Sequence, residues 1–480
     1  MIEKRAFYIG GEWVQPLSPR DHQVINPSTE EPCAVISLGA EGDADRAVAA
    51  AKAAFPAWMA RDPAERIALV ETFLEIYTRR KDEMAEAISM EMGAPIDLAS
   101  SAQWGAGYAH TKTFLRTAKD FQFIRPLGDH APNDRIVYEA TGVCALITPW
   151  NWPMNQITLK VIAALIAGCT MVLKPSEESP LNALLFAEMI DEAGFPAGVF
   201  NLVNGDGPGV GAALSGHEDV DMVSFTGSTR AGIAISQNAA KTLKKVHLEL
   251  GGKGANVIFA DADEKAVKRG VLSMMNNSGQ SCNAPSRMLV QRERYEAAVE
   301  EAAAVASAVT VGPASEPGRH IGPVVNASQF EKIQGLIETG MKEGARLVAG
   351  GPGRPEGMNR GYFVRPTVFA DATNQMTIAR EEIFGPVLTI MPFDTEEEAI
   401  RIANDTPYGL TNYVQTGDGA RANRMALQLR SGMVEMNGQP RGAGSPFGGM
   451  KASGNGREGG VWGLEDFLEV KAVSGWTEDA

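Results

Sequence analysis

The sequence predicts an α/β protein built around parallel β-sheets. Short runs rich in Val, Ile, Leu and Phe alternate with helical segments between residues 143 and 250, and a second alternation runs from Gly251 to about residue 430. Strands separated by helices of this length indicate parallel strands joined by right-handed crossovers. With 480 residues, the chain has room for about two large or three smaller domains.

The region before the first alternation is predicted to be helical. Residues 43–118 contain Ala-rich and amphipathic stretches, in which Asp62 and Pro63 indicate a helix start and Gly93 a helix end. Residues 121–138 lack this pattern and predict a short extended excursion.

Five strands are predicted in the first alternation, at residues 143–148, 170–173, 199–203, 222–225 and 246–250. Helices at 155–167 and 180–193 separate them, each followed by a glycine. The second alternation predicts strands at 256–259 and 286–290 and a helix near 296–308. A glycine-rich segment, 438–460, then precedes the strand-like FLEVKAV.

Composition disfavours several classes of partner. The chain has 44 Lys and Arg against 59 Asp and Glu, a net charge of -15. Nucleic acid and anionic membrane surfaces both require a basic footprint, so we expect neither as a partner. The longest apolar run, 161–173, is shorter than the ~20 residues of a membrane-spanning helix, and the sequence MIEKRAFYIGGEWV predicts no export signal.

The cysteines and histidines predict neither disulfides nor a metal site. The six histidines form no cluster with metal-ligand spacing. The cysteines have no paired spacing, which favours a reducing, cytoplasmic location. They are Cys33, Cys144, Cys169 and Cys282.

Polar and glycine residues follow the predicted strands of the first alternation. Examples are Asn151, Lys174, Gly227 and Glu249. Because ligands of open parallel sheets bind outside the carboxyl ends of the strands, we expect these residues to meet at one edge.

Each of these sequence features, taken alone, also has an ordinary structural explanation. GDGPGVGA matches a dinucleotide-binding turn only weakly, since it does not follow the first strand of the unit. Gly227 and Ser228 fit either a pyrophosphate site or an ordinary helix cap. Lys174 fits either a ribose contact or a solvated lysine before a turn.

Cys282 stands among small and polar residues, NNSGQSCNAPSR. This setting favours an accessible thiol over core packing. A nucleophilic thiolate needs a lowered pKa or a nearby base, yet no histidine is close in sequence. His247 shares a strand face with Glu249 by period two, and we interpret it as a packed strand histidine.

Longer motifs stand in order along nearly the whole chain: YIGGEWV, PWNWP, VLKPSE, FTGSTRAG, LELGGK, GQSC, EEIFGP, PFGGMKASGNGRE and GLEDFLEVK. In content, order and separation they resemble the NAD(P)-dependent aldehyde dehydrogenase superfamily. The resemblance implies oxidation of an aldehyde to its carboxylic acid, with a nicotinamide cofactor as hydride acceptor.

The resemblance also assigns catalytic roles. Cys282 matches the nucleophile, which forms a thiohemiacetal and then a thioester with the substrate. The Asn151 amide and the Cys282 backbone N–H match the donors to the oxyanion. Glu249 matches the base that activates water for deacylation, and Glu458 matches a second acid that assists proton movement.

Further positions match cofactor contacts in the family. Lys174 and Glu177 match the adenosine ribose contacts, and a carboxylate at Glu177 repels a 2′-phosphate, which favours NAD over NADP. Gly227 and Ser228 match the pyrophosphate site. The other matching positions are Ile147, Trp150, Gly207 (adenine), Leu250, Glu382 (nicotinamide ribose) and Phe384 (nicotinamide ring).

A third set of positions matches the substrate tunnel: Trp152, Asn155, Gln156, Ser281, Asn283, Arg441 and Phe447. Several of them are more polar than in many members. If Arg441 points inward, a polar or carboxylate-bearing semialdehyde is a possible substrate. An arginine in a loop more often faces water.

The resemblance implies three structural parts. A Rossmann-like NAD-binding domain comprises 1–118 and 139–250, an α/β catalytic domain 251–450, and a small β arm 119–138 and 465–480. Exposed strand edges of the arm pair subunits into a homodimer or homotetramer.

Two functions other than oxidation of an aldehyde by NAD are compatible with this scaffold. A CoA-acylating semialdehyde dehydrogenase is disfavoured by Glu249, since that reaction has no use for a hydrolytic base. A catalytically silent binding protein on the same scaffold is disfavoured because Asn151, Glu249 and Cys282 are all present.

Overall fold

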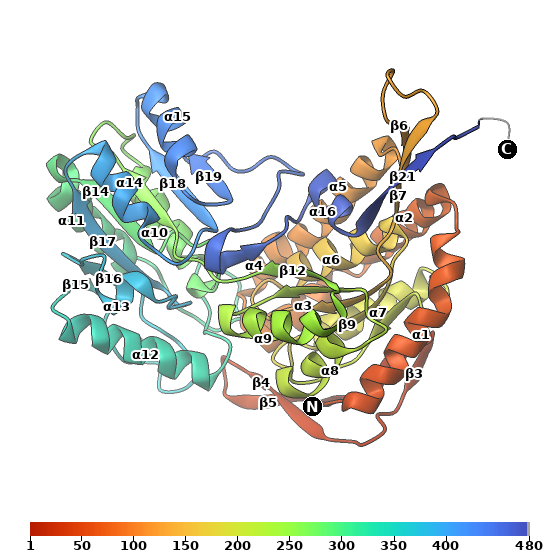
Figure 1. The fold of residues 1–480 in the computed structure, drawn as a ribbon. Coiled ribbons are helices and arrows are strands. Elements are labelled where there is room, and N and C mark those ends of the chain that lie inside the picture. The colour runs from red at the N-terminus through yellow and green to blue at the C-terminus, as the bar shows by residue number, and fades with distance from the viewer. Residues whose placement is uncertain (478–480) are drawn as a thin grey trace.

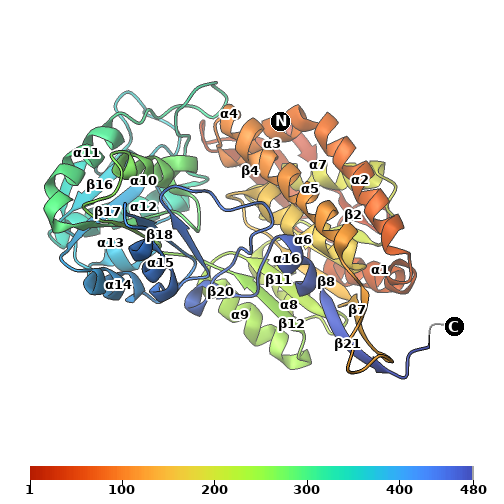
Figure 2. The same ribbon diagram turned by 90° about the horizontal axis from the view of Figure 1, so that it is seen from above.

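The computed structural model describes residues 1–477. The chain forms two α/β lobes, and a small antiparallel sheet projects from one of them (Figures 1 and 2). Among the described residues, no helix is both long and apolar enough to span a membrane.

The first lobe is organised by an eight-stranded sheet of order β20-β12-β11-β8-β9-β10-β2-β3. Its central strands are parallel and confirm the five predicted ones: β8 (Val143–Ile147), β9 (Thr170–Lys174), β10 (Phe200–Leu202), β11 (Met222–Thr226) and β12 (Lys245–Glu249). The chain winds outward from β8 in both directions. The switch point between β8 and β11 is where such sheets bind ligands.

Strands from both chain ends complete this lobe. The chain start adds β2 (Phe7–Ile9) and β3 (Glu12–Val14), and the glycine-rich segment adds β20 (Gly454–Asn455) beside β12. A separate sheet contains β1 (Ile2–Lys4), β5 (Glu31–Ser37) and β4 (Asp21–Asn26). Through β20, a distant part of the chain reaches the end of β12.

The predicted helical region is confirmed as several helices. They are α1 (Glu41–Met59), α2 (Pro63–Arg79), α3 (Lys81–Met92), α4 (Ile96–Leu98) and α5 (Trp104–Asp120), with a π-helical turn at Ala99–Gln103. Asp62 caps α2, and Gly93 ends α3 in the left-handed conformation, with φ 83°.

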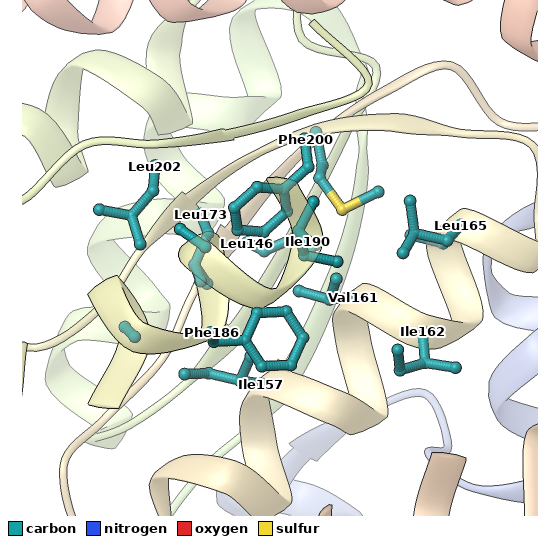
Figure 3. Close-up of a cluster of buried hydrophobic side chains, with 14 of the residues drawn as sticks. Leu146, Ile157, Val161, Ile162, Leu165, Leu173, Phe186, Ile190, Phe200 and Leu202 are labelled. Carbon is teal, nitrogen blue, oxygen red and sulfur yellow. The ribbon is translucent and has the colours of Figure 1, made fainter. Parts of the chain in front are cut away.

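The helices between the strands are α6 (Pro153–Ala167), α7 (Leu181–Glu192), α8 (Ala212–Gly216) and α9 (Thr229–Ala239). Figure 3 shows Ile157 and Val161 of α6 and Phe186 of α7 beside strand residues such as Leu146 and Leu173. Because α6 is apolar on nearly all sides, it is buried almost completely. This packing fixes its N-terminus beside the end of β8.

The second lobe contains a seven-stranded sheet, parallel except for β15. In spatial order the strands are β15 (Arg346–Ala349), β16 (Thr367–Ala370), β17 (Val387–Phe393), β14 (Arg287–Gln291), β13 (Ala255–Ile258), β18 (Thr411–Gln415) and β19 (Met433–Met436). Its helices are α10 (Ala266–Met275), α11 (Tyr295–Ser307), α12 (Ala327–Lys342), α13 (Thr377–Arg380), α14 (Glu396–Asn404) and α15 (Gly419–Gln428).

The projecting sheet has the order β21-β7-β6 and unites the predicted excursion with the C-terminal strand (Figure 1). It contains β6 (Ile124–Pro126), β7 (Asp134–Ala140) and β21 (Leu468–Ser474), all antiparallel. Within the predicted arm, residues 119–120 belong to α5 and residues 465–466 to α16 (Gly460–Asp466). The end of the predicted 465–480 segment, 478–480, lies outside the described residues.

Candidate active site

The loop that carries Cys282 is held in an unusual backbone conformation. Asn277, Ser278 and Gly279 have φ values of 50°, 57° and 73°, so three successive residues are left-handed. The last must be glycine, since a Cβ there would lie 2.1 Å from the Gly385 carbonyl oxygen. Local strain of this kind persists only where surrounding contacts enforce it.

Residues on both sides of Cys282 are tied to other elements. Trp152 Nε1 donates to Ser281 Oγ at 2.7 Å, and Tyr413 Oη donates to the Asn283 carbonyl at 2.5 Å. Gly252 packs against the Cys282 carbonyl, where a Cβ would come within 2.3 Å. These contacts fix the position of the thiol.

Asn151 lies in the turn between β8 and α6 and is buried. Its Nδ2 donates to the Gln280 carbonyl at 2.9 Å, and its Oδ1 accepts from Gln156 Nε2 at 3.3 Å. One Nδ2 hydrogen is therefore occupied by the Cys282 loop, and the amide orientation is fixed by Gln156.

A cavity of about 320 Å³ brings most of the predicted catalytic residues together. Cys282, Glu249 and Glu458 line it, whereas Asn151 lies behind the lining. Of the predicted tunnel residues, Trp152, Asn155, Gln156, Asn283, Arg441 and Phe447 also line it. Ser281 does not, and instead supports Trp152.

Glu249, the last residue of β12, is 2% exposed. Burial raises the pKa of its carboxyl to about 7, against the opposing effect of a hydrogen bond from His247, and the charge of Glu458 raises it further. Its Oε2 has no hydrogen-bond partner among the described residues. A carboxylate with this pKa can take a proton from water near neutral pH.

Glu458 accepts a 2.7 Å hydrogen bond from Lys160 Nζ, which also donates to Ser224 Oγ at 3.0 Å. Lys160 is a charged residue on the otherwise apolar α6 and is fully buried. A buried ammonium requires a partner of opposite charge. The pair therefore holds the Glu458 carboxyl group beside the cavity.

The thiol of Cys282 is in an environment that opposes ionisation. Burial, and then the charges of Glu382 and Glu249, raise its pKa to about 12. Before substrate binds, the thiol is therefore protonated at neutral pH, and its proton has to pass to a base for attack on a carbonyl.

Arg441 is an exposed residue, as expected for a loop arginine, but its guanidinium is engaged. Its Nε donates to Glu435 Oε1 at 2.9 Å, and the group stacks over Phe447 with 4.9 Å to the ring centroid. Asn155 is engaged as well, since its Oδ1 lies 2.8 Å from His110 Nε2. The cavity wall is therefore polar and held by internal contacts.

Buried polar atoms without partners mark the carboxyl edge of the first sheet. Among the described residues, Thr148 Oγ1, both side-chain polar atoms of Asn204, and Thr226 Oγ1 have no hydrogen-bond partner. Thr148 follows β8 and Thr226 ends β11, on the two sides of the switch point, and Asn204 follows β10 further along the same edge. Because an unpaired buried polar group costs about 1–3 kcal/mol, this edge is suited to a polar ligand.

Lys174 and Glu177 lie together at the end of β9. Lys174 is buried, not solvated, and Nζ donates to the Pro175 and Gly205 carbonyls and to Glu177 Oε2 at 3.4 Å. Gly207 is exposed, and a Cβ there would meet nothing within 4 Å. GDGPGVGA begins a π-helical turn, Gly207–Gly211, capped by Asp206.

Gly227 and Ser228 lie between β11 and α9. The Ser228 hydroxyl accepts from Ala231 N at 3.3 Å and so caps α9, while the Gly227 N–H bonds the Glu249 carbonyl. Ile147 and Leu250 are buried beneath this edge. The helix N-terminus remains a favourable place for a phosphate.

The EEIFGP turn lies against the other side of the same edge. Glu382 Oε1 accepts from Gly252 N at 2.9 Å. Phe384, which has φ 60°, meets Trp150 edge to face at a centroid distance of 5.5 Å. The predicted cofactor residues Trp150, Glu382 and Phe384 therefore lie near the Cys282 loop.

Comparison with known proteins agrees with this geometry. The sequence model of the aldehyde dehydrogenase family matches residues 13–473. The chain belongs to the aldehyde dehydrogenase family. It is 52% identical to 3-succinoylsemialdehyde-pyridine dehydrogenase from a Pseudomonas species, over 99% of both chains.

Solved structures of aldehyde dehydrogenases have the same fold. The enzyme from Bartonella henselae is 59% identical, with a TM-score of 0.99 over 99% of this chain and 100% of that one. A mutant of aldehyde dehydrogenase C from Pseudomonas syringae, complexed with NAD+ and octanal, is 48% identical, with a TM-score of 0.97 over 99% and 98%.

Several residues of this aldehyde dehydrogenase site were not predicted from the sequence. They are His110, Lys160, Glu435 and Asp466, and His247 has more partners than a packed strand histidine requires. The sequence does mark Lys160, because a lysine interrupts the apolar pattern of this helix. It does not mark Glu435 and Asp466, since only the fold brings their partners to them.

Proposed function

We propose that this chain oxidises an aldehyde to a carboxylic acid through a thioester on Cys282. The observation that carries the proposal is the shared cavity of about 320 Å³, which is lined by Cys282 and by Glu249, a carboxylate of raised pKa. Asn151 is fixed to the loop that leads to the thiol.

Attack begins with loss of the Cys282 thiol proton to solvent, which leaves Glu249 ionised for the later hydrolysis step. The sulfur of Cys282 then bonds the aldehyde carbon, and the oxyanion accepts hydrogen bonds from Asn151 Nδ2 and the Cys282 N–H. Bound NAD would supply the hydride acceptor that oxidation of the thiohemiacetal to a thioester requires. Glu249 takes a proton from water as the oxygen attacks the thioester carbon, and the thiolate leaves.

The carboxyl edge of the first sheet fits NAD, because it has unpaired polar atoms and an open α9 N-terminus. Gly227 and Ser228 would hold the pyrophosphate, Lys174 and Glu177 would hold the adenosine ribose, and Gly207 would leave room for the adenine. The nicotinamide end would be held by Ile147, Trp150, Leu250, Glu382 and Phe384. Glu177 favours NAD over NADP.

We propose a polar aldehyde as substrate. Support comes from the cavity wall, where His110, Asn155 and Arg441 offer hydrogen-bonding groups. Because Glu435 neutralises the charge of Arg441, an uncharged polar group of the substrate gains as much binding free energy at this position as a carboxylate does. The similarity to a pyridine semialdehyde dehydrogenase is in keeping with this class.

We further propose a cytoplasmic homodimer or homotetramer. All four cysteines are free, which suits a reducing compartment. The edge strand β21 leaves Val470 65% exposed, and Ile124 and Trp462 are also exposed large apolar residues. Exposed apolar strand edges favour pairing with another subunit.

The test is NADH formation with aliphatic, aromatic and semialdehyde substrates. We expect activity with NAD in the absence of CoA, weaker activity with NADP, and none in Cys282→Ala. A strict requirement for CoA, or no absorbance change with any aldehyde, contradicts the proposal.

A further inference from the structure

A buried histidine lies directly behind the proposed base. His247 and Glu249 stand on the same face of β12, and His247 Nε2 lies 3.4 Å from Glu249 Oε1. Both side chains are only 2% exposed. The other carboxylate oxygen, Oε2, is buried and has no hydrogen-bond partner among the described residues.

The second nitrogen of His247 contacts Asp466, the last residue of α16. Gly456 makes room for this contact, because a Cβ there would lie 3.0 Å from both His247 Nδ1 and Asp466 Oδ2. This ion pair holds the imidazole so that its other nitrogen, Nε2, faces Glu249.

Other charges around the imidazole come from neighbouring elements. Lys160 of α6 opposes its ionisation, and Lys160 is itself paired with Glu458. Lys245 of β12 lies on the Asp466 side. Burial alone lowers the pKa of His247, but hydrogen bonds to Asp466 and Glu249 raise it to about 9. The imidazole is therefore cationic at neutral pH.

We propose that His247, oriented by Asp466, is a positioning residue that keeps Glu249 ionised and turns its free oxygen toward the cavity. The inference rests on the proposed role of Glu249 as the base. Without a cation at Nε2, a buried carboxylate retains its proton to higher pH. A protonated Glu249 cannot accept a proton from water.

The test uses variants that keep the shape of the pair. His247→Gln retains a donor toward Glu249 but carries no charge, and Asp466→Asn removes only the charge that stabilises the imidazolium. His217→Gln is the matched control, because His217 Nε2 lies 3.5 Å from Asp45, whose side chain is 57% exposed, outside the cavity lining. Decay of the acyl-enzyme is measured against pH by rapid quench and intact mass spectrometry.

We expect the acid limb of the decay rate to move up by about one pH unit in both variants. That shift corresponds to a decay rate that is roughly tenfold lower than wild type near pH 6 and equal to wild type near pH 9. His217→Gln retains the wild-type profile. A purely structural role instead lowers the rate by the same factor at every pH, and this result, or an unmoved acid limb, overturns the inference.

Glu249→Gln separates this inference from the proposed function. If its acyl-enzyme persists while both variants keep the wild-type acid limb, the role of His247 alone is wrong. If Glu249→Gln decays at the wild-type rate, the base assignment is wrong and the inference fails with it. If His247→Gln does not fold, Asp466→Asn alone provides the test: a shifted acid limb supports the inference, and an unmoved acid limb overturns it.

Discussion

The Asn151 side-chain amide donates a 2.9 Å hydrogen bond to the carbonyl of Gln280, two residues before Cys282. The bond joins the first turn after β8, in one lobe, to the nucleophile loop of the other. Gln103 reinforces the link, since its Nε2 donates to the Asn151 carbonyl at 3.0 Å. The proposed oxyanion donor is therefore placed relative to the proposed nucleophile by a hydrogen bond to the loop that carries Cys282.

Replacing Asn151 with Ala removes both this tether and an oxyanion donor. We expect kcat to fall by about 10²–10³, the usual cost of one such donor. Steady-state NADH formation measures it, with Asn238→Ala as control, because Asn238 makes a side-chain bond to Ser215 far from the cavity. A near wild-type kcat in Asn151→Ala argues against the oxyanion role.

The pKa of about 12 at Cys282 predicts slow alkylation of the ligand-free protein. Since only the thiolate reacts, the rate rises about tenfold per pH unit throughout the accessible range. Iodoacetamide labelling followed by peptide mass spectrometry measures this rate, and Cys282→Ala gives the background. A plateau near neutral pH contradicts a protonated resting thiol.

Lys160→Met leaves the Glu458 carboxylate buried without its partner. Breaking a buried pair in this way costs about 3–5 kcal/mol of stability. Calorimetry should show a clearly lower Tm, and the double variant with Glu458→Gln should regain part of it. Lys471→Met, which removes an exposed ion pair with Glu139, is the control and should change Tm little. An unchanged Tm in Lys160→Met is inconsistent with a buried ion pair.

The pairing of Arg441 with Glu435 predicts how substrate preference can be changed. Glu435→Gln frees the guanidinium, so activity on succinate semialdehyde relative to butanal should rise about tenfold, the value of one charge-assisted hydrogen bond. Arg441→Ala should lower the ratio. Ratios of kcat/KM measure both effects, and if neither variant changes the ratio, Arg441 does not face the substrate.

The sequence predicted the sheet and the ends of its strands because these depend on local patterns. The strands β8 to β12 follow from apolar runs, and the helix ends follow from glycines such as Gly168. The left-handed backbone at Asn277 and Ser278 could not be predicted, since their side chains bond the Asn151 and Gly322 carbonyls of distant segments. In the glycine-rich segment 438–460, Gly442, Gly444 and Gly459 line the cavity, and Gly448 and Gly456 pack against Glu249 and His247.

The partners of the catalytic carboxylates also lay beyond prediction. Period two placed His247 beside Glu249, but only the fold brings Asp466 of α16 to its other nitrogen. Arg441 was placed at the cavity mouth by resemblance, whereas its neutralisation by Glu435 depends on the approach of β19. Contacts between distant segments leave no pattern in a single sequence.

The central claim is that Glu249 activates water to release an acyl group from Cys282, and Glu249→Gln tests it most directly. After mixing with aldehyde and NAD, acid quench and intact mass spectrometry should show close to one acyl group per chain on Cys282. Turnover should fall by about 10²–10⁴, the usual contribution of a general base. Continued turnover without an adduct on Cys282 contradicts the account.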